Sequence, residues 1–440
     1  MEISKMIAEI PVLAKTFVVF FMVLALNKAR LKLSTCLFAG AVVLGAWVGM
    51  GVSPLAKSLA SNLVHFDTVN LAVVVGLILV ISRLMKESGQ MERIVSRFGG
   101  LTRDPRMVGA AMPALIGLLP MPGGALFSAP MVETAFCHTT LSGEKKTIVN
   151  YWFRHVWEYW WPLYPGVVLA VGLLRVEIWQ FMLIMMPMTG VTVLAGLFFI
   201  LRPMGLQAVP GRVVRNENAL QAFIWEIMPI VVVVMVIAAV AATSMTLRTI
   251  GINAVLPGGS AILPGLLAAL IWVVYVNRIP LHQLWKALAN RELLPMILLV
   301  VSIMLFKGVM TDSHAVYHIR DELISYQFPL IWIVMVMPFL SGLVTGIAIG
   351  FVGTSFPLVI PLFPVASPVE YLSYACLAYT FGYMGMMLSP VHLCFLVTKD
   401  YFDASLFHSY RPIALPVITV LVSAWLYFML LKNGASGLFL

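Results

Sequence analysis

The sequence predicts an all-α polytopic membrane protein with two inverted repeats, about ten transmembrane helices and two re-entrant hairpins. The first observation behind this prediction is composition: of 440 residues, 61% are hydrophobic and 11% are charged, and the mean hydropathy is +0.97. A chain this apolar cannot present a polar exterior to water, so lipid must be the solvent for much of its surface. In lipid every backbone N–H and C=O must be satisfied inside its own segment, which favours helices. The second is length, because apolar stretches of roughly 18–25 residues suit helices that cross about 30 Å of hydrocarbon. The third is a repeated order of elements.

The first half of the chain contains a broken apolar segment at residues 107–138. The run Leu119-Pro-Met-Pro-Gly-Gly124 divides it into arms of about twelve residues, which rise about 18 Å and are too short to cross. Basic residues flank both ends. We therefore expect a hairpin that enters and leaves on one side. Full-length helices are expected at 10–27, 33–52, 69–85, 148–174 and 177–201.

The second half repeats this order after a non-periodic stretch at residues 203–221. That stretch predicts a cytoplasmic linker between a first repeat, 1–202, and a second, 222–440. A glycine-rich stretch at 341–353 interrupts the apolar segment 330–363 and predicts a second hairpin. Its break is expected at Gly353-Thr354-Ser355. Full-length helices are expected at 222–242, 261–277, 293–310, 373–398 and 412–431.

Matching residues support the repeat. Pairs 225 residues apart are Met112-Pro113 with Met337-Pro338, Gly117-Leu118 with Gly342-Leu343, and Pro165 with Pro390. Each half has an odd number of full crossings, so the second half must begin on the opposite side of the membrane and the repeats must be inverted.

Basic residues predict the orientation, because Lys and Arg favour cytoplasmic loops. With both termini outside, most of the 28 Lys and Arg fall in cytoplasmic segments. The sequence thus predicts a multi-pass protein of the cell inner membrane, whose first hairpin enters from the cytoplasm and whose second enters from outside. The net charge of +9 follows from this orientation, so no nucleic-acid partner is predicted.

The breaks in the two hairpins are the predicted binding site. Irregular backbone at membrane depth is tolerated only where protein buries it or where it lines a wet cavity, and paired breaks in inverted repeats point to a transporter site. New helix N-termini present free N–H groups that suit an anion. The alternative is a pair of ordinary helices with kinks. The predicted substrate-binding residues are Pro122, Gly123, Gly124, Ser128, Gly353, Thr354 and Ser355.

The segment 148–174 carries ionisable residues at membrane depth, which are functional candidates by default. Arg154 and Glu158 share a helix face at i, i+4. We expect Arg154 to bind an anionic substrate and Glu158 or His155 to carry a coupling proton; the alternative is a structural ion pair. His392, beside the second hairpin, is a further candidate for substrate binding. The aromatic residues around them form either a membrane-interface belt or a pocket wall: Tyr151, Trp152, Trp157, Tyr159, Trp160, Trp161 and Tyr164.

The cysteines give no sign of a disulfide or a metal site. None has CxxC spacing, and all lie in apolar or hairpin segments. We interpret them as small buried apolar residues: Cys36, Cys137, Cys376 and Cys394.

Two segments resemble a known family. The run Leu119-Pro-Met-Pro-Gly-Gly-Ala-Leu-Phe-Ser-Ala-Pro-Met131 and the run Ser389-Pro-Val-His-Leu-Cys394 are similar to those of the integral-membrane family called domain of unknown function 401, and the resemblance extends over most of the chain. That family is similar in turn to the ion transporter superfamily, whose members include carboxylate and gluconate permeases. The resemblance implies an elevator-type architecture and a homodimer, with segments 10–27, 33–52, 222–242 and 261–277 as the scaffold. The Ser-Asn-Thr signature of sodium–dicarboxylate carriers is absent, so neither Na⁺ coupling nor a dicarboxylate carries over.

These features predict a secondary active transporter of a small solute, an organic anion such as a carboxylate, coupled to H⁺ or Na⁺. The expected partners are this anion, the lipid bilayer and a second copy of the chain, with no cofactor and no enzymatic activity. A passive channel or exporter is an alternative, and an intramembrane enzyme is a second one that no Ser/His/Asp or metal-ligand pattern supports. The sequence does not predict the substrate's identity, the coupling ion or the direction of transport.

Overall fold

The described part of the chain is helical and contains no strand in the computed structural model. The structure describes residues 10–98, 104–118, 120, 124–137, 139–204, 219–250, 260–327, 329–364 and 367–434. Among these residues, five helical segments are long and apolar enough to cross a membrane. They are α5 (Phe66–Glu87), Ile178–Met204, Gln221–Leu247 within α12 (Ala219–Thr249), α15 (Leu293–Asp312) and Leu406–Asn433 within α21 (Leu406–Gly434). The chain is therefore a membrane-embedded helical protein.

Helices lie at most of the predicted places, and in the described part of the chain five of the ten predicted crossings are long enough to span a membrane. Helices at the predicted places are α2 (Val12–Lys28), α3 (Leu33–Val48), α5, α12, α13 (Leu263–Val276), α15 and α21, of which α2, α3 and α13 are shorter than the 18 residues expected of a full crossing. The helix predicted at 177–201 is α11 (Ile178–Gly196), continued by a π-helical turn, η1 (Leu197–Leu201), and a 3-10 turn, η2 (Arg202–Met204). Residues 205–218 of the predicted linker lie outside the described residues. Short helices connect the longer ones: α4 (Val52–Leu63), α6 (Gln90–Phe98), α14 (Leu281–Leu288) and α16 (Ala315–Ser325).

Two predicted continuous helices are wrong, because each is broken near its middle. The segment 148–174 consists of α9 (Gly143–Arg154), a non-helical stretch at 155–164, and α10 (Pro165–Leu174). The segment 373–398 consists of α19 (Pro368–Met387), a break at 388–392, and α20 (Leu393–Tyr401). Proline lacks an N–H and disfavours helical backbone in the residue before it. It therefore accounts for the start of α10 at Pro165 and for the second break, which contains Pro390.

Both predicted hairpins are present as two short helices joined by a break. The first is α7 (Pro105–Ile116) and α8 (Ala125–Ala135), broken where the sequence predicts. The second is α17 (Leu330–Thr345) and α18 (Ala348–Val359), which continues into a 3-10 turn, η4 (Ile360–Leu362).

The break predicted at Gly353-Thr354-Ser355 is wrong, since these residues lie inside α18. The chain turns instead at Gly346, whose φ of +64° is a left-handed conformation that glycine adopts without strain. Gly353 has a packing role: a Cβ there would lie 2.3 Å from Cδ1 of Ile303 on α15. A glycine-rich stretch therefore does not by itself locate the turn.

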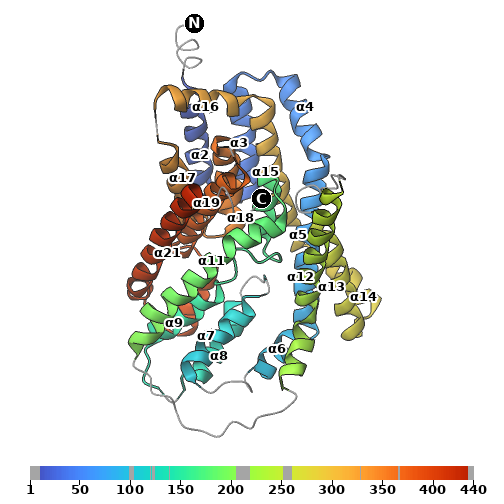
Figure 1. Cartoon of the computed structure of the whole chain (residues 1–440), viewed down its shortest axis with the longest axis vertical. Helices are drawn as coiled ribbons and strands as arrows, with labels where there is room; N and C mark the ends of the chain where they lie inside the picture. The colour runs from blue at the N-terminus through green and yellow to red at the C-terminus, as the bar shows by residue number, and fades with distance from the viewer. Residues whose placement is uncertain are drawn as a thin grey trace.

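Packing divides the described helices into two groups (Figure 1). The first group, called here the outer group, contains α2 to α6 and α12 to α16. The second, the hairpin group, contains both hairpins, both broken helices, α11 and α21. Contacts between the groups include α5 with α10, α15 with α18, and α2 with α17. In the view of Figure 1, the α7–α8 hairpin lies toward the lower end with α6, whereas α17 lies toward the upper end with α4 and α16.

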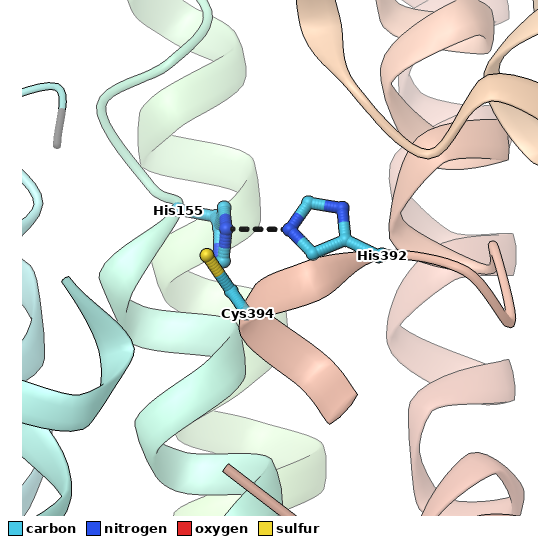
Figure 2. Close-up of side chains that lie close together, drawn as sticks. All are labelled: His155, His392 and Cys394. Carbon is cyan, nitrogen blue, oxygen red and sulfur yellow. Dashed lines mark hydrogen bonds between the residues drawn. The ribbon is translucent and has the colours of Figure 1, made fainter. Parts of the chain in front are cut away.

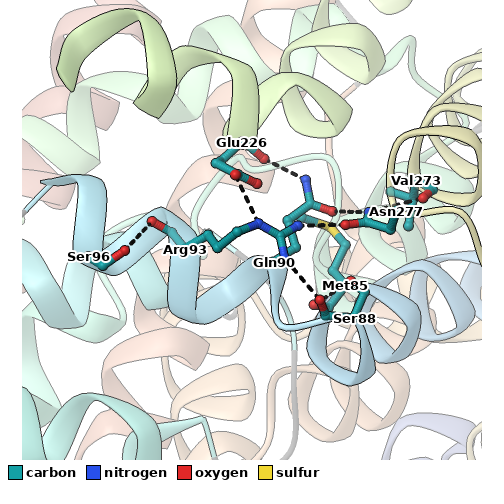
Figure 3. A network of polar contacts seen from close by, with 8 residues as sticks. All are labelled: Met85, Ser88, Gln90, Arg93, Ser96, Glu226, Val273 and Asn277. Atoms are coloured by element: carbon teal, nitrogen blue, oxygen red, sulfur yellow. Dashed lines mark hydrogen bonds and ion pairs between the residues drawn. The ribbon is translucent and has the colours of Figure 1, made fainter. Parts of the chain in front are cut away.

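A polar network fixes α6 within the outer group (Figure 3). Nε of Arg93 donates to Oε1 of Glu226 at 2.9 Å, and its NH2 and NH1 atoms donate to Oδ1 of Asn277 and to the carbonyl of Ser88. Gln90 donates to the carbonyl of Glu226 and accepts from Asn277. One arginine thus joins the turn after α5 to both α12 and α13.

Candidate functional site

The break after α9 places three ionisable residues inside the protein. Arg154, the last residue of α9, is 2% exposed, His155 is 1% exposed and Glu158 is 6% exposed. An NH1 of Arg154 and Nε2 of His155 each lie 3.8 Å from Oε1 of Glu158. Both separations exceed hydrogen-bonding distance.

His155 meets His392 from the second broken helix (Figure 2). Their Nε2 atoms lie 3.1 Å apart, and Nδ1 of His155 lies 2.6 Å from the carbonyl oxygen of Tyr151. Because a carbonyl only accepts, we assign the proton of His155 to Nδ1. Nε2 of His155 then accepts a hydrogen bond from Nε2 of His392.

Cys394 completes this cluster, although the sequence analysis interpreted it only as a small buried apolar residue. His155, His392 and Cys394 each offer one ligand atom, and these three atoms lie within 4.8 Å of one another. The two histidines are 237 residues apart in the chain, so no local spacing could reveal the arrangement. The signal available was the position of Cys394 two residues after His392, at the start of α20.

Tyrosines satisfy the backbone at the two breaks. Tyr379 and Tyr383 of α19 donate to the carbonyls of Glu158 and His155, at 2.9 and 2.6 Å. Tyr151 of α9 donates in the opposite direction, to the carbonyl of Met387 at 3.0 Å. Broken backbone can persist at membrane depth only if its polar groups find partners inside the protein. Each broken helix supplies such partners to the other.

The aromatic cluster around the first break lies inside the protein, so the interface-belt interpretation is wrong. Six of its seven members are buried, and Trp157 is partly buried. Trp157 and Trp161 donate at 2.9 Å to the carbonyls of Ala114 and Leu118, and Tyr164 donates to that of Gly117. The last turn of a helix leaves carbonyls without partners. These aromatic side chains therefore satisfy the carbonyls at the C-terminal end of α7 and hold the first hairpin against the break.

Four helix N-termini surround the breaks without a side-chain cap. They are the starts of α8, α10, α18 and α20. A Cβ on Gly166 would lie 2.7 Å from Cβ of Ala348, which brings α10 and α18 together. A Cβ on Gly346 would lie 3.1 Å from the backbone nitrogen of His392, which brings the second hairpin's turn to α20. Helix N-termini carry partial positive charge.

Asn150, which the sequence analysis missed, joins the start of α8 to this region. It lies on α9, four residues before Arg154, and its Nδ2 donates at 3.0 Å to the carbonyl of Ala125 and to Oγ1 of Thr398. Its buried Oδ1 accepts no hydrogen bond from the described residues. The amide therefore keeps acceptor capacity next to the break.

The residues predicted to bind substrate at the hairpin breaks lie in different parts of the two hairpins. Gly124 precedes α8 directly, and Ser128 donates to the carbonyl of Ala125 at 3.3 Å. Thr354 and Ser355 donate to carbonyls of their own helix, at 2.8 and 2.6 Å, and Thr354 also pairs with Ser341. Pro122 and Gly123 lie outside the described residues. The structure thus brings Gly346, in place of Gly353-Thr354-Ser355, to the breaks.

Two glycines 225 residues apart make equivalent contacts. A Cβ on Gly117 would lie 2.0 Å from the carbonyl oxygen of Arg154, and one on Gly342 would lie 2.1 Å from that of Gly382. Each hairpin therefore packs backbone to backbone against the broken helix that follows it in the chain.

A cavity of about 480 Å³ lies between the two groups of helices. Its walls come from α5, from the start of α15 and from Pro120 in the first hairpin's connection, and they include Arg83 and Lys86. Nζ of Lys86 lies 4.9 Å from the ring centre of Phe127 on α8. The cavity thus reaches the first hairpin, and its wall carries the two carboxylates of Glu87 and Glu292, both ion-paired with Arg83, as well as the two basic side chains.

Comparison with known proteins identifies the family. The family model described as protein of unknown function, DUF401, matches residues 10–431. The chain belongs to this family, which confirms the resemblance found in its sequence. No curated protein matches the chain.

Proposed function

We propose that this DUF401 chain is a secondary active transporter of a small organic anion, bound at the buried breaks of the hairpin group. The observation that carries the proposal is the meeting of four uncapped helix N-termini beside a buried arginine. Backbone N–H groups at helix starts bind carboxylates and phosphates, and the aligned peptide dipoles favour negative charge. A guanidinium adds paired N–H donors that match a carboxylate.

The loose ion pair supports exchange of an anion. At 3.8 Å, the carboxylate of Glu158 balances the charge of Arg154. A substrate carboxylate can take this place if Glu158 is protonated, so binding of the anion and of a proton are linked. This gives Glu158 the predicted coupling role, favours H⁺ over Na⁺ as the coupling ion, and makes His155 a second candidate to carry the proton.

The packing supports an elevator mechanism with inverted repeats. The hairpin group holds all the proposed site residues, whereas the outer group holds the predicted scaffold helices α2, α3, α12 and α13 and also α5 and α15. The contacts of Gly117 and Gly342 are those expected of repeat-related positions. We propose that the hairpin group moves against the outer group, and that the cavity at Pro120 is the cytoplasmic approach to the site.

The outer group is also where a homodimer would form. Only 22% of the apolar window of α12 is buried, so much of this helix faces lipid or a second copy. The proposed setting is the cell inner membrane, with both termini outside. Cysteines placed at Arg97 and Lys145 should then be labelled from the cytoplasmic side, and cysteines at Lys57 and Arg320 from outside, in a Cys137→Ser background. The reverse pattern would overturn the orientation.

Binding and uptake by the purified protein test the function. A screen of small carboxylates by thermal unfolding should find one that stabilises the protein, because a ligand that binds only the folded state raises its stability. Proteoliposomes should then accumulate that anion in a saturable manner when a pH gradient is imposed. Uptake that never saturates would favour the passive channel or exporter, and chemical turnover of the anion in detergent would favour an enzyme.

A further inference from the structure

The side chains of His155, His392 and Cys394 point toward one another in the interior of the hairpin group (Figure 2). We propose that they form a binding site for a borderline-soft transition-metal ion, with Zn²⁺ as the ion that fits best. The site goes beyond anion transport, since it needs only the folded chain and the metal. Imidazole nitrogen and thiolate sulfur are the ligands that Zn²⁺ prefers in proteins.

The distances are close to those of a tetrahedral site. Zn–N bonds of about 2.0–2.1 Å and Zn–S bonds of about 2.3 Å place neighbouring ligand atoms about 3.3–3.8 Å apart. The two Nε2 atoms already lie 3.1 Å apart, and the widest separation in the cluster is within 4.8 Å. An inward movement of about 1 Å by one side chain therefore completes the three-ligand set.

The orientation of His155 is the one that a metal ligand requires. Its Nδ1 donates to the carbonyl of Tyr151 at 2.6 Å, which leaves the lone pair of Nε2 directed at His392 and Cys394. Metal-binding histidines almost always donate their second nitrogen to such a partner. Tyr151 also donates its hydroxyl to the carbonyl of Met387, just before the break that carries His392. One residue thus positions both segments that supply the ligands.

Glu158 lies next to the cluster without belonging to it. Its Oε1 lies 3.8 Å from Nε2 of His155 but is not among the ligand atoms that lie within 4.8 Å of one another, so its side chain would have to move to become a fourth ligand. The Cys394 thiol loses its proton when it binds the metal, so the thiolate balances one of the two positive charges of Zn²⁺. Zinc would join the first break to the second and hold the two broken helices in one relative position.

Cobalt provides the direct test, because Co²⁺ takes the same tetrahedral ligands as Zn²⁺ and absorbs visible light. The full-length protein in detergent, carrying Cys137→Ser to remove an exposed thiol, is titrated with Co²⁺ alone. We expect one equivalent to produce tetrahedral bands together with a thiolate charge-transfer band, and Zn²⁺ to remove both. Cys376→Ser, which removes a buried cysteine outside the cluster, is the matched control and should leave the spectrum unchanged.

The variants decide the outcome. Cys394→Ser should abolish the charge-transfer band, and His392→Ala should weaken binding at least about tenfold, the lower end of the range seen when only a supporting group is lost. The absence of a thiolate band in the folded protein, or a band that survives Cys394→Ser, would overturn the site. If His392→Ala does not fold, the spectrum of Cys394→Ser decides alone. Neither result bears on anion uptake, so the metal site and the transport proposal stand or fall separately.

Discussion

Two polar clusters inside this protein contain an arginine and a glutamate, and they are built differently. Arg93 and Glu226 are 2.9 Å apart in a network where the arginine also donates to Asn277 and Ser88 (Figure 3). Arg154 and Glu158 are 3.8 Å apart and more deeply buried, with side-chain exposures of 3% and 7% against 38% and 11%. The more buried pair is therefore the more loosely held one.

The difference is the one expected if the Arg93 network is structural and the Arg154 region has the proposed binding role. A buried polar group that is left unsatisfied costs free energy, so a network that only stabilises the fold is expected to use its donors and acceptors fully. The Arg93 network follows this rule. The region of Arg154 departs from it, because the Oδ1 atom of Asn150 accepts no hydrogen bond from the described residues. Spare binding capacity at membrane depth is typical of a ligand site.

The largest expected effect is on transport, from Arg154→Gln. Loss of a hydrogen bond to a charged group costs about 1.5–3 kcal/mol, which corresponds to a loss of roughly 10- to 100-fold in anion affinity. Uptake into proteoliposomes should therefore fall to background at low anion concentration. Arg83→Gln, at the cavity wall, is the control of equal charge change and should reduce uptake only modestly. Full uptake by folded Arg154→Gln would show that this arginine is a structural residue like Arg93.

The next effect concerns coupling, from Glu158→Gln. The amide cannot release or take up a proton, so anion exchange should continue while accumulation driven by a pH gradient is lost. Uptake and counterflow measured on the same proteoliposomes distinguish the two activities. If the Gln variant still accumulates anion in response to the gradient, Glu158 only balances the charge of Arg154, and His155 becomes the residue to test.

A smaller effect, on stability alone, is expected from Arg93→Met. It leaves the carboxylate of Glu226, Oδ1 of Asn277 and the carbonyl of Ser88 without their donor. Because the arginine is 38% exposed, water can reach part of the network, and we expect a loss of about 1–3 kcal/mol in the free energy of unfolding. Thermal unfolding in detergent measures it. Uptake per folded molecule should be unchanged, and a loss of uptake would give α6 a role in transport.

The sequence predicted the first hairpin correctly because Pro-Met-Pro-Gly-Gly cannot continue a helix. It misplaced the second, since Gly342, Gly346, Gly350 and Gly353 look alike in sequence, whereas only Gly346 adopts a positive φ. The other three glycines leave space for atoms that pack against them, and only the tertiary structure shows which atoms lie there. For the same reason the sequence identified Arg154, His155, Glu158 and His392 individually and missed Cys394, whose importance depends on a segment far away in the chain.

The smallest expected effect is that of Glu226→Gln, and it tests the comparison most directly. The amide oxygen can still accept from Nε of Arg93, so only the charge of the pair is lost, and we expect a change below about 1 kcal/mol in unfolding free energy. Transport and its dependence on the pH gradient should both stay unchanged. The same substitution at Glu158 should have the opposite signature: gradient-driven accumulation is lost, and the free energy of unfolding falls because the amide no longer balances the buried charge of Arg154. If the two Gln variants behave alike in both assays, the looser geometry around Arg154 has no functional meaning, and the anion site must be sought at the cavity lined by Arg83 and Lys86.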